Sequence, residues 1–528
     1  MVASVVDTQT IGPSAAERLA LRVMQLGAIA VVLVVSTFNV FELDRFFLPK
    51  ELALHLTAVA AALLAFRGIT RLSVTRVDLL LIGYLLLSTL SAAMATNRWL
   101  AMRALAISVS GALIFWTSRA LRDAGLAPPL LGALTLAVVL AAVTSLLQTY
   151  GVDIVLFSES RVPGGTLGNR NFVAHIAAFG LPLCMLAAFR ARSFFRSISV
   201  AIVTASLVLT RSRAAWLAFA AVMLVFFVAM LVSSALRRDG RTWRRLAAIL
   251  ILAGCGVAAA LLIPNTLRWR SRNPYLESIQ RVADYQEGSG RGRLVQYQQS
   301  LWMAVRHPLF GVGPGNWAVE YPAHAARRDP SLNESEPGMT FNPWPSSDWV
   351  ALVAERGFPA AVLLALVVVF IAIGGVRQLI SAVDAEEALV ATALLGTVVG
   401  VIVAGLFDAV LLAAVPSFLV WAAVGALRSP SPRGGQRVVG VALIAVIVIA
   451  AIGAARSAMQ IAAMQIYATR GDRASLERAA RIDPGSYRLQ LRLARVGGRK
   501  ERCQHARAAH DLFPSAIAAT EASRGCGE

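Results

Sequence analysis

The chain has 528 residues, of which 57% are hydrophobic and 15% charged, and its formal net charge is +20. So large an apolar fraction in a chain of this length excludes an ordinary soluble protein and indicates a bilayer as its main solvent. Most of the positive charge lies in short segments between apolar runs, where topology and anionic lipid explain it better than nucleic acid does. We therefore expect membrane lipid, and no nucleic acid, as a partner.

Apolar runs that are long enough to cross a bilayer occupy most of the chain. A hydrocarbon core of about 30 Å needs roughly 20 apolar residues per helix. Thirteen runs meet or approach that length, although 197–210 is short and 388–427 is divided only by Asp408, so twelve crossings remain the alternative. We predict an all-α, polytopic membrane bundle of about 12–13 transmembrane helices. The predicted runs are 23–42, 50–66, 77–95, 99–118, 127–149, 171–189, 197–210, 214–236, 246–264, 347–373, 388–407, 409–427 and 438–456.

Lys and Arg in short loops indicate the orientation, because cytoplasmic loops carry an excess of them. Alternate loops are rich in arginine, and the amino terminus, with Arg18 and Arg22, belongs to the same face. That terminus lacks the features of a cleavable signal peptide, so the first run is expected to stay as a helix. The tail would be extracytoplasmic with thirteen crossings and cytoplasmic with twelve. The loop arginines are Arg67, Arg71, Arg76, Arg119, Arg122, Arg190, Arg192, Arg196, Arg237 to Arg245, Arg428, Arg433 and Arg437.

The division of the chain follows from these runs. Residues 1–22 form the cytoplasmic amino terminus, 23–264 hold helices one to nine, and 347–456 hold helices ten to thirteen. Between them, 265–346 is a large polar extracytoplasmic loop, and loops of this size are usually functional or disordered. The segment 457–528 is a small helical tail.

Two features stand out within the large loop. The stretch from Arg291 to Arg306 has an amphipathic helical pattern typical of a helix on the membrane surface. A cluster from Pro308 to Gly315 then ends it; its glycines allow the backbone to approach another group closely, and a plain helix stop is the other interpretation. The apolar face of the predicted helix comprises Leu294, Tyr297, Leu301, Trp302 and Val305.

The tail contains a weak repeat. The segments Ala479 to Pro484 and Leu512 to Pro514 end predicted helices roughly 30 residues apart and look like degenerate tetratricopeptide units. Such units stack on partners or on the rest of the same protein, so we expect a possible protein partner there and no chemistry.

Four cysteines are present, without the spacing of a metal site, and we predict no metal and no cofactor. Cys503 and Cys526 have the opportunity to pair if the tail is extracytoplasmic.

Several arginines lie on the face where the positive-inside tendency does not require them. Arg211 and Arg213 occupy the outward turn between helices seven and eight, and Arg161 and Arg170 the preceding outward loop. Guanidinium groups match phosphate oxygens in bidentate geometry, so a pyrophosphate on a lipid carrier fits this position. Snorkelling to phospholipid phosphates is the alternative. Arg291 and Arg293 would add charge to the same place.

Several motifs, in chain order, resemble the O-antigen ligase and O-antigen polymerase superfamily. Gly165 to Ala174 looks like its Gly-Asn-x-Asn element at the start of a helix, and Thr210 to Trp216 resembles its Ser-Arg turn. The resemblance covers roughly 160–365 and agrees with the long loop between helices nine and ten. A loop signature of that family is matched by Arg293, Tyr297, Trp302 and the run His307 to Trp317.

The resemblance implies a metal-independent, inverting glycosyltransferase at the outer face of the bacterial cytoplasmic membrane. Its donor would be an undecaprenyl-diphosphate-linked glycan, and its acceptor a glycan or glycolipid. Fixed cations would stabilise the charge on the departing diphosphate, a role that falls to Arg211 or Arg213 and Arg291 or Arg293. Asn169 and Asn171 would shape the site or cap a helix. The substrate-binding candidates are Gly168, Asn169, Arg170, Asn171, Tyr297, Gly313, Asn316 and Trp317.

One position departs from the family pattern. A His-Asn pair usually precedes the tenth helix, but here Ser346 stands in place of the His, and a serine is too weak a base to replace an imidazole unaided. Asp348, two residues on, and His324, upstream in the loop, are the remaining catalytic candidates. Asp348 has a second interpretation as the amino cap of helix ten.

Other interpretations stay open at this point. Without the His, the chain could be a non-catalytic family member in polysaccharide assembly or export. A secondary transporter needs buried polar residues at mid-membrane, and Arg103 and Asp408 are the only notable ionisable residues near the predicted helices. Aromatic side chains in and beside the loop would stack on sugars or anchor the protein at the interface: Trp317, Tyr321, Trp344 and Trp349.

Overall fold

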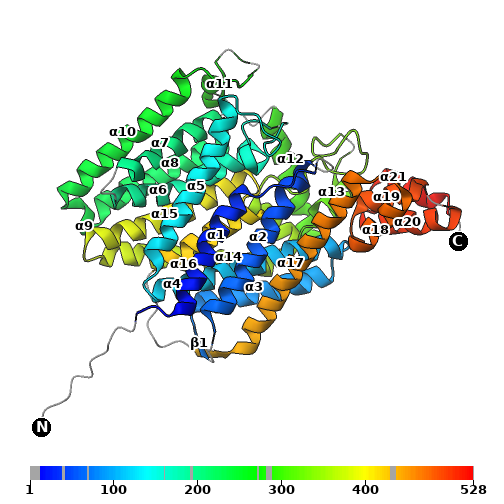
Figure 1. The fold of residues 1–528 in the computed structure, drawn as a ribbon, viewed down its shortest axis with the longest axis horizontal. Coiled ribbons are helices and arrows are strands. Elements are labelled where there is room, and N and C mark those ends of the chain that lie inside the picture. Colours follow the sequence, from blue (N-terminus) through cyan, green and yellow to red (C-terminus); the bar gives the residue numbers. More distant parts are fainter. Residues whose placement is uncertain are drawn as a thin grey trace, which may run out of the picture.

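Helices make up nearly all of the secondary structure (Figure 1). The computed structural model describes residues 12–38, 42–67, 71–159, 161–190, 194–269, 271, 273–280, 288–326, 328–428, 436–496 and 498–526. Up to the large loop the helices are α1 Ala15–Leu33, α2 Glu42–Ala65, α3 Arg76–Ala93, α4 Arg98–Asp123, α5 Ala127–Thr149, η1 Gly165–Leu167, α6 Arg170–Phe189, α7 Phe194–Leu209, α8 Arg213–Val232, α9 Ser234–Arg237 and α10 Gly240–Leu262.

The large loop contains three helices, and the remaining helices follow it. They are α11 Pro274–Gln280, α12 Gly288–Arg306, α13 Trp317–His324, α14 Asp348–Ser381, α15 Ala385–Phe407, α16 Ala414–Leu427, α17 Gly440–Thr469, α18 Arg473–Ile482, α19 Tyr487–Val496, α20 Arg499–Leu512 and α21 Ile517–Arg524. Two short strands, β1 Arg71–Val74 and β2 Gln436–Val439, pair antiparallel, with Arg71 opposite Val439.

The prediction of a polytopic helical bundle is confirmed. Ten helices in the described part of the chain are long and apolar enough to cross a membrane, and two shorter apolar helices, 197–209 and 414–427, fall on predicted runs. The first predicted run is displaced, because α1 starts at Ala15, where Ser14 and Glu17 form a capping box. α17 continues to Thr469, well beyond the predicted end at 456, because Arg456 is buried and forms an ion pair with Asp483 of the tail.

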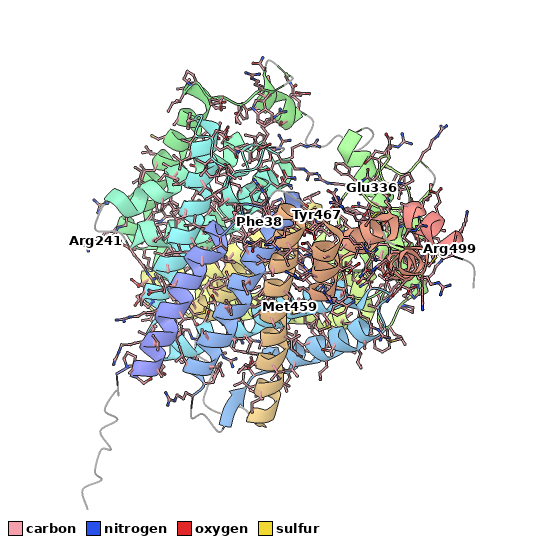
Figure 2. All side chains as sticks on the ribbon, turned by 45° about the vertical axis from the view of Figure 1, so that its right-hand side comes forward. Phe38, Arg241, Glu336, Met459, Tyr467 and Arg499 are labelled. Atoms are coloured by element: carbon pink, nitrogen blue, oxygen red, sulfur yellow. A yellow bond between two sulfur atoms is a disulfide. The ribbon has the colours of Figure 1, made fainter. Side chains whose placement is uncertain are left out.

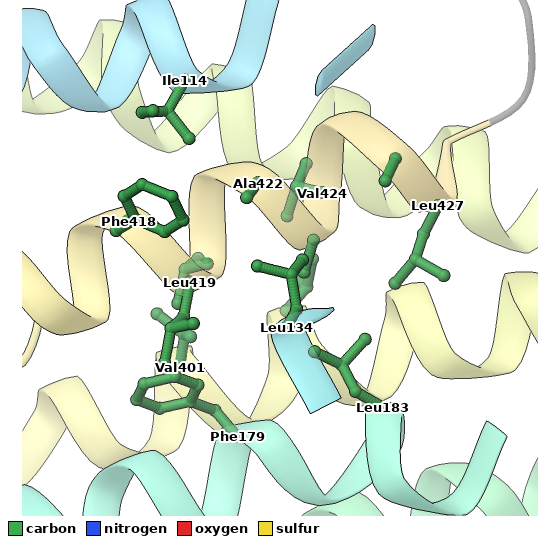
Figure 3. Close-up of a cluster of buried hydrophobic side chains, with 14 of the residues drawn as sticks. Ile114, Leu134, Phe179, Leu183, Val401, Phe418, Leu419, Ala422, Val424 and Leu427 are labelled. Carbon is green, nitrogen blue, oxygen red and sulfur yellow. The ribbon is translucent and has the colours of Figure 1, made fainter. Parts of the chain in front are cut away.

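The centre of the bundle is α6, most of whose residues are buried between α5, α7, α8 and α15. Figure 3 shows Phe179 of α6 beside Val401 and Leu183 of α6 near Leu134, both from neighbouring helices. Gly400 of α15 sits against Phe179, so the two backbones approach closely. Small residues of this kind let membrane helices pack through van der Waals contact, because lipid provides no hydrophobic driving force.

The tail and the large loop lie at the same end of the molecule (Figures 1 and 2). The Asn97 side chain, at the start of α4, donates to the Leu512 carbonyl at 3.1 Å, and the Ile517 amide donates to the Pro337 carbonyl at 3.1 Å. Arg488 forms an ion pair with Glu336 of the loop at 3.5 Å. These contacts place the tail on the side predicted for an odd number of crossings.

Within the tail, the helices form two hairpins with the same turn. After α18 the Asp483 amide donates to the Ala479 carbonyl at 2.8 Å, and after α20 the Phe513 amide donates to the Ala509 carbonyl at 3.1 Å. The turns are thus one repeat apart, while the tetratricopeptide assignment stays a prediction. Cys503 and Cys526 form a disulfide, as expected for cysteines outside a reducing compartment.

Candidate functional site

A cavity of about 520 Å³ lies at the outward end of α6, next to the first residues of the large loop. Three guanidinium groups line it, from Arg161, Arg170 and Arg268, and the ring of Trp269 forms part of the wall. We call it the arginine cavity. The remaining lining residues are Val162, Asn169, Asn171, Thr266 and Leu267.

The Gly-Asn-x-Asn element builds the inner wall of this cavity. Gly168 adopts φ +76°, and a Cβ there would lie 2.6 Å from the ring of Phe46, so only glycine fits. Asn169 caps α6, accepting from the Asn171 amide at 3.0 Å, and the Arg170 amide donates to the Arg161 carbonyl at 3.0 Å. The element thereby holds two cationic residues at a helix amino terminus, where the backbone dipole also favours an anion.

Trp269 links the Ser-Arg turn to the cavity. The guanidinium carbons of Arg170 and Arg211 lie 5.0 and 4.7 Å from the centre of its ring. Arg211 has φ +55°, the left-handed conformation that side chains other than glycine rarely adopt. The fixed turn lets its guanidinium donate to the Ser278 hydroxyl at 3.1 and 2.9 Å, with Glu277 at 3.8 Å. Backbone strain of this kind often accompanies functional sites.

The cavity presents hydrogen-bond donors without anionic partners. Within the described ranges, Arg161, Arg170 and Arg268 form no ion pair. Beside them, the Trp269 indole nitrogen and the Tyr275 hydroxyl are buried and, apart from each other, have no hydrogen-bond partner among the described residues. Burial raises the pKa of Tyr275, which keeps the phenol protonated as a donor. Converging cations and donors of this kind suit a group with several phosphate oxygens.

Asn171 extends the site towards Asp408, at the end of α15. Its amide donates to Asp408 at 3.4 Å, and the same carboxylate lies 3.9 Å from the His175 ring. His175 is buried in α6, and neither ring nitrogen has a hydrogen-bond partner among the described residues. Arg293 lies within electrostatic range of this histidine. Nothing in the sequence singles out His175, because a lone histidine in an apolar helix carries no spacing signal.

The four arginines predicted as catalytic therefore fall into two groups, those that lie at the site and those that do not. Arg211 joins the arginine cavity through Trp269, and Arg293 stands near the Asn171 and Asp408 contact. Arg213, the first residue of α8, and Arg291, exposed near the start of α12, do not line the cavity. Arg268 and Trp269, which do line it, carry no motif in the sequence.

The Tyr297 hydroxyl fixes the junction of loop and bundle. It lies 2.7 Å from the carbonyl oxygens of both Ser346 and Leu406. The helix that carries it also presents an exposed apolar face, with Leu294, Leu301, Trp302 and Val305 all more than 40% exposed. This agrees with the amphipathic pattern predicted for the segment.

Asp348 supports the chain between α15 and α16. Its carboxylate accepts from the Val410 amide at 2.9 Å and from the Leu411 amide at 3.0 Å, while Ser347 caps α14. Both oxygens of Asp348 are therefore engaged by backbone amides, and Asp348 is the first residue of α14 after its cap. His324 ends α13, with Nδ1 3.0 Å from the Glu320 carbonyl. Neither residue lines the arginine cavity.

The loop glycines approach α14. The Gly313 amide donates to the Glu355 carbonyl at 2.8 Å, and the Gly315 amide to the Glu355 carboxylate at 2.9 Å. Asn316 accepts from the Asn97 amide at 2.7 Å, and the Trp317 indole donates to Ser300 at 2.8 Å. The group that these glycines approach closely is therefore α14 of the protein itself. The predicted binding residues Gly313, Asn316 and Trp317 are all engaged in internal contacts.

The prediction that Arg103 and Asp408 are the only notable ionisable residues near the helices is wrong. Several more are buried, because they are paired with one another or bound to backbone groups. Arg103 forms a two-pronged contact with Glu51, at 2.8 and 2.9 Å, and the Arg45 guanidinium donates to the Phe157 carbonyl at 2.9 Å. The other buried charged or histidine side chains, of which His175 alone lacks a hydrogen-bond partner among the described residues, are Lys50, His55, Asp78, His175, Asp329, Asp348, Glu355, Arg356, Arg456 and Asp483.

Comparison with known protein families gives a match over the middle of the chain. Residues 198–365 match the family model described as O-antigen ligase. The match covers 168 of the 528 residues, from α7 to the middle of α14, and includes Arg211, Arg293 and the large loop. It confirms the O-antigen ligase resemblance seen in the motifs. A search of curated proteins gives no match.

The match and the fold together support a multi-pass membrane protein with an O-antigen ligase-type function. Members of this family are membrane enzymes of the glycosyltransferase kind, and lipid-linked glycans are their general class of substrate. The Gly-Asn-x-Asn element and the helical tail lie outside the matched residues.

Proposed function

We propose that the chain transfers or polymerises a glycan from an undecaprenyl-diphosphate-linked donor at the outer face of the bacterial cytoplasmic membrane. One observation carries the proposal: Arg161, Arg170 and Arg268 line a single cavity, and Arg211 joins them across Trp269. Scattered arginines that snorkel to phospholipids would not share a cavity. The donor's diphosphate is the anion that this cavity would hold.

The proposed glycosyl transfer forms one bond and breaks one bond at the anomeric carbon. The acceptor hydroxyl oxygen bonds to the anomeric carbon of the donor glycan, and the bond from that carbon to the diphosphate oxygen breaks. The diphosphate leaves with the bonding electrons, and the arginines stabilise its new charge in place of a metal ion. Attack from the opposite face inverts the anomeric centre, in keeping with the inverting mechanism that the family resemblance implies.

The acceptor's proton needs a base. Asp348 and His324 were the candidates from sequence, but amides occupy the Asp348 carboxylate, and His324 lies outside the cavity. Asp408 is joined to the cavity by its contact with Asn171, so it is the better-placed carboxylate. Ser346 keeps a structural role, since its carbonyl accepts from Tyr297.

Replacement of Arg211 by alanine tests the diphosphate role. We expect transfer from an undecaprenyl-diphosphate donor in proteoliposomes to fall about 100-fold or more, because loss of one charge-stabilising donor typically costs that much. Binding of undecaprenyl diphosphate, measured by native mass spectrometry, should weaken with it. Arg241→Ala is the matched control, because Arg241 is exposed at the start of α10, the end opposite the cavity (Figure 2).

Three results would contradict the proposal. Equal transfer by the Arg211 variant and wild type would remove the arginine cavity from the mechanism. Lipid binding without any transfer by the wild type would favour the non-catalytic alternative. Solute flux without transfer would favour a transporter.

A further inference from the structure

A second cavity, of about 350 Å³, lies on the same side of the molecule between the bundle and the tail. Its walls come from α2, α4, α14, α17, the large loop, the segment between α15 and α16, the first tail hairpin and Phe513 of the second. We call it the tail cavity and define it by Glu51, Arg103, Trp344, Gln460 and Tyr487. Its size is within the usual range for small-molecule sites, and no residue is shared with the arginine cavity.

Charges in the tail cavity are balanced. Arg103 binds Glu51 at 2.8 Å and Asp44 at 3.6 Å, and Arg356 lies beside Glu355 at 3.9 Å. An anion therefore gains no net attraction there, unlike in the arginine cavity. The two cavities consequently suit different chemical groups.

The remaining lining suits a neutral sugar. Aromatic rings of Trp344, Tyr467 and Tyr487 provide apolar surfaces for the C–H faces of pyranose rings. The Gln460 side-chain oxygen and the Arg356 Nε are buried and have no hydrogen-bond partner among the described residues. Buried polar atoms are normally paired, so an unpaired acceptor and an unpaired donor on two residues that line one cavity fit a ligand that carries hydroxyl groups.

A small aromatic cluster lies between the two cavities. Phe47 and Trp344 line the tail cavity, and their ring centres lie 5.5 and 6.1 Å from that of Phe172, which follows Asn171 of the arginine cavity. Leu411 and Leu412 also line the tail cavity, a few residues after Asp408, which contacts Asn171. A sugar in the tail cavity would thus lie next to the site proposed for the donor's diphosphate.

We propose that the tail cavity binds the acceptor, and that it recognises a neutral, hydroxyl-rich sugar at the acceptor's end. This rests on the proposed transferase function. The tail then acts as a positioning element: its Asp483 to Tyr487 turn closes the cavity, held by the Arg456 and Asp483 ion pair and by the close packing of Gly485 on Trp99.

Two variants test this assignment without touching the arginines. Leu412→Trp fills the tail cavity, and Gln460→Leu removes its unpaired acceptor while keeping the side-chain size. The acceptor preparation is membranes from a strain that lacks this gene, with an undecaprenyl-diphosphate glycan as donor. We expect Leu412→Trp to lower transfer at least tenfold, and Gln460→Leu to raise the KM for the acceptor about tenfold. Undecaprenyl diphosphate binding should stay within twofold of wild type for both.

Matched controls come from the same helices or from lipid-facing positions. Met459→Leu neighbours Gln460 on α17 but is 43% exposed (Figure 2), and Val369→Trp adds an indole to the exposed face of α14. Both controls should transfer normally. Gel filtration and thermal unfolding confirm that each variant folds.

The outcomes separate this inference from the proposed function. Normal transfer and normal acceptor KM in folded Leu412→Trp and Gln460→Leu variants would overturn the acceptor site alone. Loss of diphosphate binding in these variants would also overturn it, because the cavity would then serve the donor. Loss of the Arg211 effect would instead overturn the proposed function. Competition by a methyl glycoside of a neutral hexose, but not of a uronic acid, supports the charge argument, and the reverse order would refute it.

Discussion

The two cavities at the outward end differ in how their arginines are paired. In the tail cavity, Arg103 is matched by Glu51 and Asp44. In the arginine cavity, Arg161, Arg170 and Arg268 form no ion pair within the described part of the chain, and Arg211, whose partner is Glu277, stands across Trp269. Unpaired like charges are unfavourable for the empty protein, which fits the anionic ligand that we propose for this cavity. A paired arginine already has its partner and serves the fold.

The two cavities also differ in which parts of the chain build them. The arginine cavity takes Thr266 to Trp269 from the matched family segment, and Arg211 beside it lies inside that segment. The tail cavity takes residues of the large loop and α14 from the same segment and adds residues of α17 and the tail, which lie outside it. Holding a diphosphate is a task that many donors share, whereas the sugar recognised as acceptor differs from one protein to another. We therefore associate the first cavity with the reaction and the second with specificity.

The largest effect on stability should come from breaking the paired arginine. Arg103→Ala leaves Glu51 buried without a counter-charge, and we expect it to cost about 3–5 kcal/mol in unfolding free energy. Arg170→Ala relieves repulsion between like charges and should leave stability unchanged or raised. Thermal unfolding in detergent measures both. Combining Arg103→Ala with Glu51→Gln should recover most of the loss, because the stranded charge is removed. Equal destabilisation by Arg103→Ala and Arg170→Ala would show that the paired and the unpaired arginine do not differ in their contribution to stability.

Loss of the disulfide should lower the stability of the tail more than it lowers glycan transfer. Replacing Cys503 and Cys526 by serine removes a cross-link that spans 23 residues, which should cost the tail about 2–4 kcal/mol. The disulfide ties the second hairpin, whereas the tail residues that line the tail cavity come from the first hairpin except for Phe513. Transfer should therefore fall less than twofold. Limited proteolysis of the tail should become faster. Cys255→Ser, at an exposed unpaired cysteine, should change neither the rate of proteolysis nor the rate of transfer. Four free thiols in the mature wild-type protein, in place of the two of Cys184 and Cys255, would place the tail in a reducing compartment instead.

Much of the fold follows from the sequence, since an apolar run of bilayer length has few alternatives as a helix. The exceptions have local causes. Arg456 suggested the end of a helix, yet α17 continues because Asp483, from the tail, pairs with that charge inside the protein. A contact between residues so distant in sequence leaves no periodic signal in the chain.

The candidate site was predictable only where a motif carried it. Arg170 and Arg211 stood in recognisable turns, and the structure brings both to Trp269. Trp269 itself, and Arg268 beside it, lie in an irregular segment whose position depends on how the large loop folds back. The tail cavity was not predicted, because its polar residues come from helices and loops that meet only in three dimensions.

The smallest of these effects on stability should come from the bend in α14 at Gly357, which contacts the large loop. Gly357 has φ +79° within α14, and a Cβ there would overlap the Leu309 carbonyl of the large loop. Gly357→Ala should therefore cost about 1–3 kcal/mol and displace the loop from Glu355, lowering transfer several-fold while leaving diphosphate binding within twofold. Gly374→Ala, on the same helix with open space around it, should be neutral or slightly stabilising. Because Glu355 lines the tail cavity and not the arginine cavity, a Gly357 variant with weakened diphosphate binding would show that the two cavities do not act separately.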